Sequence, residues 1–84
     1  MKKDQNFQYI QNVLKKWFID KKKIIDLEED FFKKNVLDSL EVITLVEFLE
    51  IKFNIKFNHQ EFQKKDFKSI SGIAKIIFNK KNEI

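Results

Sequence analysis

The sequence contains a single glycine, Gly72, and no proline among its 84 residues. Tight β-hairpin turns depend on glycine, so a hairpin-rich β fold is disfavoured. The apolar residues instead recur at steps of three and four, which is the spacing of one helix face. The sequence therefore predicts an all-α protein, and its length predicts a single domain over residues 1–84.

The apolar spacing places two helices in the first two thirds of the chain. The first covers roughly residues 5–19, and Asp4 is its expected N-cap. The second begins directly after Asp38 and is expected to end near Phe53 or Asn54. Their core-facing residues are predicted to be Phe7, Ile10, Leu14, Trp17, Phe18, Val42, Leu45, Val46, Leu49 and Phe53.

The remaining segments predict a long loop and two further helices. Residues 20–37 show no sustained period and predict a long, partly packed loop, of the kind that often serves function in a small domain. A capping box from Asn58 to Glu61 predicts a short helix around residues 59–64. Ser69 is expected to cap a last helix over about 70–79, with Ile70, Ile73, Ala74, Ile77 and Phe78 inward.

Composition excludes several kinds of chemistry. There is no cysteine, which excludes a disulfide framework and a thiolate zinc site. The only histidine, His59, excludes a His-pair metal motif, leaves little room for a Ser–His triad, and is expected at the surface. The polar start of the chain predicts no signal peptide and no apolar run is long enough to predict a membrane span, so the expected compartment is the cytoplasm.

The charges are unevenly distributed. The net charge is +4, and all 17 basic residues are lysine. Residues 38–50 nevertheless carry four acids and no lysine, while residues 1–23 and 51–84 are each net +5. An acidic helix in a basic chain predicts a docking surface for basic partners. The absence of arginine disfavours a nucleic-acid partner, although a small basic module that binds nucleic acid remains an alternative function.

Ser39 is the strongest candidate for a chemically functional residue. Asp38 and Glu41 form a capping-box pattern, which makes Ser39 the first residue of its helix. The unpaired amides and the dipole at that end favour an anion, such as a phosphate ester on the serine hydroxyl. No base is adjacent in the sequence, so Ser39 is expected to be a hydroxyl that another enzyme modifies. Ile43 and Glu47 share the side of Ser39, which predicts that Ile43 is exposed.

The segment VLDSL at residues 36–40, followed by EVITLVEFLEIKFNIKF, resembles the acyl carrier proteins and the related peptidyl and aminoacyl carriers. These proteins share Asp-Ser-Leu at the start of the second helix and a Leu-Glu-x-x-Phe-x-Ile end, here LEIKFNI at residues 49–55. The resemblance extends over nearly the whole chain. It implies a four-helix bundle of acyl-carrier type with a long first loop and a short third helix.

The resemblance implies a carrier and not an enzyme, with no catalytic or metal-binding residues. In that family a phosphopantetheinyl transferase uses coenzyme A and magnesium to attach 4′-phosphopantetheine to the serine, which by position is Ser39. The arm would hold an acyl or aminoacyl group as a thioester and present it to enzymes of fatty-acid, polyketide or related biosynthesis. A loading ligase or synthase is a further implied partner, and the chain is expected to be a monomer. The residues implied in partner recognition are Asp38, Leu40, Glu41, Ile43 and Glu47.

The sequence departs from the carriers of fatty-acid synthesis. They usually have a Leu-Gly pair shortly before Asp-Ser and are strongly acidic, whereas this chain has NVL at residues 35–37 and is net positive. In these features the chain is similar to stand-alone carriers of specialised pathways and to the D-alanyl carrier of teichoic acid modification. A D-alanyl or other aminoacyl carrier for the cell envelope therefore stays open as an alternative.

Overall fold

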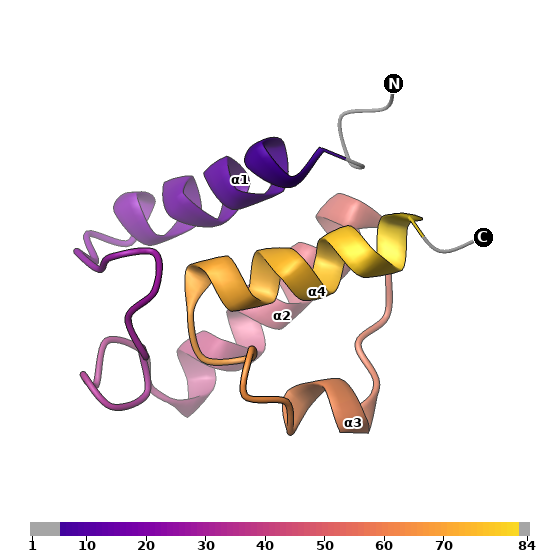
Figure 1. Ribbon diagram of the computed structural model, residues 1–84. Coiled ribbons are helices and arrows are strands. Elements are labelled where there is room, and N and C mark those ends of the chain that lie inside the picture. The colour runs from indigo at the N-terminus through magenta and orange to yellow at the C-terminus, as the bar shows by residue number, and fades with distance from the viewer. Residues whose placement is uncertain (1–5, 83–84) are drawn as a thin grey trace.

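Four helices follow one another in the computed structural model, which describes residues 6–82. They are α1 (Phe7–Asp20), α2 (Ser39–Phe53), α3 (His59–Phe62) and α4 (Ile70–Asn82). α1 packs against α4, and the short α3 lies on the path from the end of α2 back to α4 (Figure 1). The prediction of an all-helical domain with a long first loop and a short third helix is confirmed.

The start of α1 differs from its prediction. The helix begins at Phe7, and its N-cap is Asn6, whose side-chain oxygen accepts a hydrogen bond from the Tyr9 amide at 3.0 Å. The prediction that Asp4 caps this helix was wrong, and Asp4 itself lies outside the described residues. Asparagine and aspartate are equally good N-caps, so residue type alone does not distinguish position 4 from position 6.

The core contains the residues that the helical spacing predicted. Eleven of the fifteen are buried, while Phe7, Val42, Val46 and Phe78 are partly buried and pack against the others. One core residue of α4 was missed, because Ile76 is only 3% exposed. α4 buries a wider face than a single stripe, and Gly72 and Ala74 are buried on it as well.

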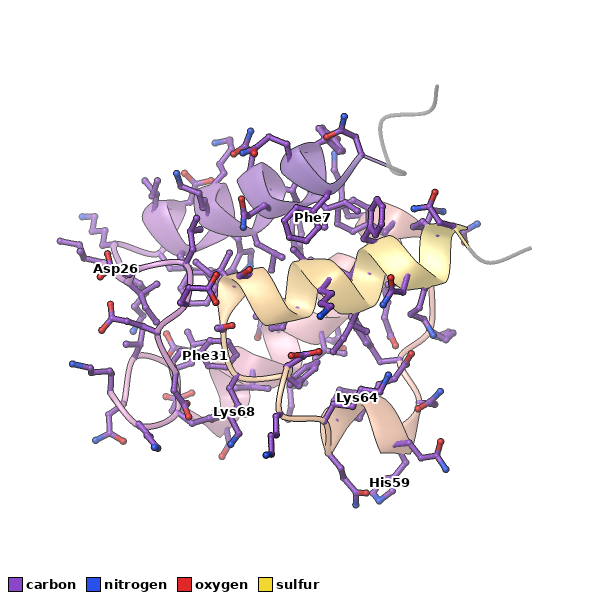
Figure 2. All side chains as sticks on the ribbon, in the orientation of Figure 1. Phe7, Asp26, Phe31, His59, Lys64 and Lys68 are labelled. Atoms are coloured by element: carbon purple, nitrogen blue, oxygen red, sulfur yellow. The ribbon has the colours of Figure 1, made fainter. Side chains whose placement is uncertain are left out.

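The long loop is packed against the start of α4. The Phe31 amide donates to the Lys68 carbonyl at 2.8 Å, and the Ser71 amide donates to the Leu27 carbonyl at 2.9 Å. The Phe31 ring is fully buried, and Figure 2 shows Phe31 beside the segment that holds Lys68. The predicted partly packed loop is therefore confirmed, and two backbone hydrogen bonds fix its position.

The start of α4 follows its prediction, with one close approach that requires glycine. The Gly72 amide donates to the Ser69 hydroxyl at 2.9 Å, which is the predicted cap. The helix continues to Asn82, three residues beyond its predicted end. A Cβ on Gly72 would lie 1.9 Å from the Asp66 carbonyl oxygen, so only glycine allows α4 to pack on this preceding turn.

Candidate functional site

The start of α2 is held by the predicted capping box. The Asp38 carboxylate accepts the Glu41 amide at 2.8 Å, and the Glu41 carboxylate accepts the Asp38 amide at 3.0 Å. Asp38 has extended backbone angles (φ −91°, ψ 179°), as an N-cap requires. Both bonds are local, and together they determine that the helix begins at Ser39.

Ser39 is solvent-exposed at this first helical position. The amide of Val42 already donates to the Asp38 carbonyl at 3.0 Å, and that of Glu41 to the Asp38 side chain. The amides of Ser39 and Leu40 donate to no residue within 6–82. An anion joined to the Ser39 hydroxyl would therefore meet free N–H groups and the positive end of the helix dipole.

Glu41 contacts the loop after α1 as well as the cap residue Asp38. The Nζ of Lys23, in the loop after α1, lies 3.1 Å from the Glu41 Oε2. The hydrogen bond from the Asp38 amide, followed by the bond from Lys23, lowers the pKa of the Glu41 carboxyl below its ordinary value. Glu41 therefore stays charged at the start of α2, but half-buried and already paired.

Leu40, Ile43 and Glu47 form an exposed strip along α2. Leu40 is 74% exposed and Ile43 is 55% exposed, which confirms the prediction that Ile43 faces solvent. Glu47 is exposed too, and no described residue forms an ion pair or hydrogen bond with its carboxylate. The strip beside Ser39 is thus apolar at its start and negatively charged one turn further on.

The other acidic residue of α2, Glu50, has a structural role. Its Oε2 accepts the Phe57 amide at 2.9 Å, and its Oε1 lies 3.9 Å from the Nζ of Lys56. These bonds hold the connection that leads from α2 toward α3. Among the four acids of residues 38–50, Glu47 alone lacks an internal partner among the described residues.

The sequence did not indicate the part that Lys23 plays. It belongs to three consecutive lysines, which suit the negative end of α1, and its partner Glu41 is 18 positions away. Such a pairing depends on the path of the loop between them. The predicted surface location of His59 is confirmed, because the residue is exposed and Figure 2 shows it on the outer side of α3.

Two further observations limit what the described part of the chain contains. Residues 6–82 hold no group of three or more histidine, cysteine or acidic side chains that could bind a metal ion. None of the helices within the same range has both the length and the apolar character to cross a lipid bilayer.

A four-helix domain with a long first loop and an exposed Asp-Ser-Leu start on α2 has the architecture of the acyl-carrier class. The sequence is 34% identical over 58 residues to a D-alanyl carrier protein of Lactococcus lactis subsp. lactis (strain IL1403). That match covers 69% of this chain and 73% of the relative. The chain belongs to the family of carrier proteins that comprises acyl carrier and D-alanyl carrier proteins. No family model and no solved structure matches it.

Proposed function

We propose that this protein carries an acyl or aminoacyl group as a thioester on a 4′-phosphopantetheine arm attached to Ser39. Membership of the carrier family supports the general role. The observation that carries the assignment to Ser39 is the position of its hydroxyl, exposed at the first residue of α2 beside the Asp38 cap.

The surroundings of Ser39 suit a phosphopantetheine group. The hydroxyl is open to an incoming transferase, and the free amides of Ser39 and Leu40 favour the negative charge of a phosphodiester. The bound arm would supply the thiol that this cysteine-free chain lacks. The Asp38–Glu41 capping box would keep the attachment point rigid, because it fixes the helix start independently of the arm.

The proposal assigns no catalytic step to the chain itself. The Asp38 carboxylate next to Ser39 accepts the Glu41 amide, so it serves as a cap. The single histidine, His59, lies on α3, and its ring contacts Gln63 at 3.2 Å. A phosphopantetheinyl transferase and a loading ligase or synthase would perform the chemistry in the cytoplasm. The tether would raise the effective concentration of the cargo at each docked enzyme.

The proposal also concerns the identity of the group that the arm carries. Sequence features alone favour a general acyl carrier and leave an aminoacyl carrier open. The similarity to a D-alanyl carrier protein favours the aminoacyl alternative, with D-alanine as its first candidate. Both cargoes would use the same arm on the same serine.

The attachment site can be tested by mass spectrometry of the intact protein. Incubation with a broad-specificity phosphopantetheinyl transferase, coenzyme A and magnesium should add one phosphopantetheinyl group to the wild type. Ser39→Ala should gain none, while the control Ser71→Ala, on α4, should be modified like the wild type. An unmodified wild type, with a transferase active on another carrier, would contradict the proposal.

The cargo requires a second assay on the modified protein. A D-alanine-activating ligase and a fatty-acyl ligase, each with ATP and its substrate, should be offered in separate reactions. We expect a D-alanyl mass increase that hydroxylamine removes, as a thioester requires. Loading by the fatty-acyl ligase alone would overturn the D-alanyl assignment and leave the carrier role in place.

A further inference from the structure

The end of α1 and the loop after it expose two isoleucines among lysines. Ile24 is 98% exposed and Ile19 is 64% exposed, the former being the most exposed large apolar residue described. Both line a shallow cavity of about 230 Å³ together with Lys15 and Lys23. We call this surface the α1 tip, which comprises Lys15, Ile19, Lys21, Lys22, Lys23 and Ile24.

The α1 tip is strongly basic for its size. Residues 15–25 contain five lysines and one aspartate, Asp20, which pairs with Lys16 at 3.1 Å. Neither Lys15 nor Lys22 has an acidic partner among the residues that the structure describes. Lys15 and Lys22 therefore accompany the exposed isoleucines with no acidic partner in the described range.

The backbone of the α1 tip is firmly bonded. The Lys22 amide donates to the Ile19 carbonyl at 2.8 Å, and the Lys23 amide donates to the Phe18 carbonyl at 2.9 Å. Lys22 itself has a left-handed φ of 60°, which ends the helix and turns the chain. The exposure of Ile24 thus follows from a well-formed turn, and its side chain contributes little to the core.

From this arrangement we propose that the α1 tip docks on an anionic lipid surface. Lysines at headgroup level attract negatively charged lipids, while aliphatic side chains beside them enter the acyl boundary. Nucleic acid would use the lysines, but single-stranded binding relies on aromatic stacking, which isoleucine does not supply. A lipid surface uses both exposed components, Lys15 with Lys22 and Ile19 with Ile24.

Lipid docking would also orient the serine. The Lys23–Glu41 ion pair at 3.1 Å joins the α1 tip to the first turn of α2, two residues after Ser39. Figure 1 shows the end of α1 and the start of α2 at the same end of the molecule, away from the end of α4. A protein bound by its tip would hold Ser39 near the lipid headgroups. This second step rests on the proposed function, whereas the lipid binding itself does not.

The expected association is weak and reversible. Each lysine near an anionic surface contributes about a fivefold gain in affinity. Partial insertion of Ile24 adds about tenfold, less than full burial of such a side chain would give. After the tip the next acidic residue is Asp26, which Figure 2 places on the loop that follows, so the docking surface is limited to the tip.

Co-sedimentation with lipid vesicles tests the proposal. At low salt the full chain should bind vesicles rich in phosphatidylglycerol and leave pure phosphatidylcholine vesicles unbound. Ile24→Ser should weaken binding about tenfold, and Lys15→Gln combined with Lys22→Gln should weaken it about 25-fold. The matched controls are Ile51→Ser, whose parent residue is 84% exposed on α2, and Lys64→Gln combined with Lys65→Gln. Both controls should bind like the wild type.

The outcomes separate this inference from the proposed function. Ser39→Ala should bind the vesicles as well as the wild type does, because the tip does not include the serine. No binding to the anionic vesicles, or equal losses in the control variants, would overturn the inference. Tighter binding to polyglutamate or to DNA than to the vesicles would also overturn it and would assign the tip to that partner. None of these results changes the expected phosphopantetheinylation.

Discussion

Among single residues, Glu41 has the most partners at the start of α2. One carboxylate oxygen accepts the Asp38 amide, and the other lies 3.1 Å from the Nζ of Lys23. The same carboxylate therefore completes a local cap and joins the helix to a loop 18 positions earlier in the chain. Both bonds favour its charged form, which is why the pKa of Glu41 is lowered.

The lowered pKa of Glu41 predicts a pH-dependent contribution to stability. Since the folded pKa lies below the unfolded value of about 4.3, the contribution is present above that pH and is lost as the pH falls through the folded pKa. Glu41→Gln keeps an acceptor for the Asp38 amide but removes the charge. We expect the variant to unfold at a lower urea concentration than the wild type at neutral pH, and this difference in urea midpoint should shrink as the pH falls below the unfolded value. The control Glu47→Gln should show no such difference, and a difference for Glu41→Gln that is independent of pH would contradict this account.

A second residue-scale prediction concerns Gly72. In an ordinary exposed helix, Gly→Ala stabilises by about 1 kcal/mol. Here the added Cβ would meet the Asp66 carbonyl oxygen at 1.9 Å, and backbone cannot move aside as a flexible side chain can. Gly72→Ala should therefore destabilise by about 1–3 kcal/mol or more. Thermal unfolding measures this, with Ser71→Ala as the control. An unchanged melting temperature would show that α4 is free to shift.

At the scale of the elements, the four-residue α3 depends on its neighbours. Its capping box is satisfied, with the Glu61 carboxylate accepting the Asn58 amide at 2.8 Å. The same carboxylate accepts two bonds from the Lys80 Nζ on α4, at 3.0 and 3.1 Å. The Glu61 side chain is 11% exposed and that of Lys80 is 20% exposed, so this pair links α3 to α4 with little water around it.

Removal of one partner of this pair should destabilise the fold. Lys80→Met keeps most of the volume and leaves the Glu61 charge buried without its cation. We expect the free energy of unfolding to fall by about 3 kcal/mol, the lower end of the range for buried pairs, because Lys80 retains some contact with water. Lys16→Met is the matched control, since the exposed Lys16–Asp20 pair should contribute less than about 1 kcal/mol. If urea unfolding shows the same decrease in the free energy of unfolding for Lys80→Met and Lys16→Met, burial does not distinguish the two ion pairs.

How far the sequence predicted these elements depended on the range of each interaction. The capping boxes at Asp38 and Asn58 join residues three apart, so they were visible as local patterns. The Lys23–Glu41 and Glu61–Lys80 pairs join residues 18 and 19 apart and depend on how the loops run. The closeness of Gly72 to Asp66 depends likewise on the packing of α4, which helical spacing does not describe.

The same distinction applies to the candidate site. The exposure of Ser39 and Ile43 followed from helical spacing relative to the core-facing residues, and the structure agrees. The sequence also suggested that the acids of α2 form one surface for partners. In the structure Glu41 and Glu50 are engaged with Lys23 and the Phe57 amide, which a charge count along the chain cannot show.

At the scale of the whole molecule, the charge pattern predicts how a partner would approach. The chain is net positive, yet the side of α2 that holds Ser39 carries Glu47, whose carboxylate has no partner within residues 6–82. A basic surface on a modifying enzyme would be guided toward this side and away from the lysines elsewhere. Glu47 is therefore the residue where electrostatic guidance can be tested without disturbing the fold.

Reversal of this charge should slow modification of Ser39 while the fold stays intact. Under the proposed function, Glu47→Lys should reduce the rate of phosphopantetheinylation about threefold or more at low ionic strength, mainly through slower encounter with the transferase. The difference should vanish near 1 M salt, where charges are screened beyond about 3 Å.

Asp66→Lys makes the same charge change on the segment before α4 and should leave the rate unchanged. Circular dichroism should give equal helicity for both variants. If the two variants are slowed equally, net charge and not the α2 strip controls the encounter, and if neither is slowed, Leu40 and Ile43 remain as the contacts to test next.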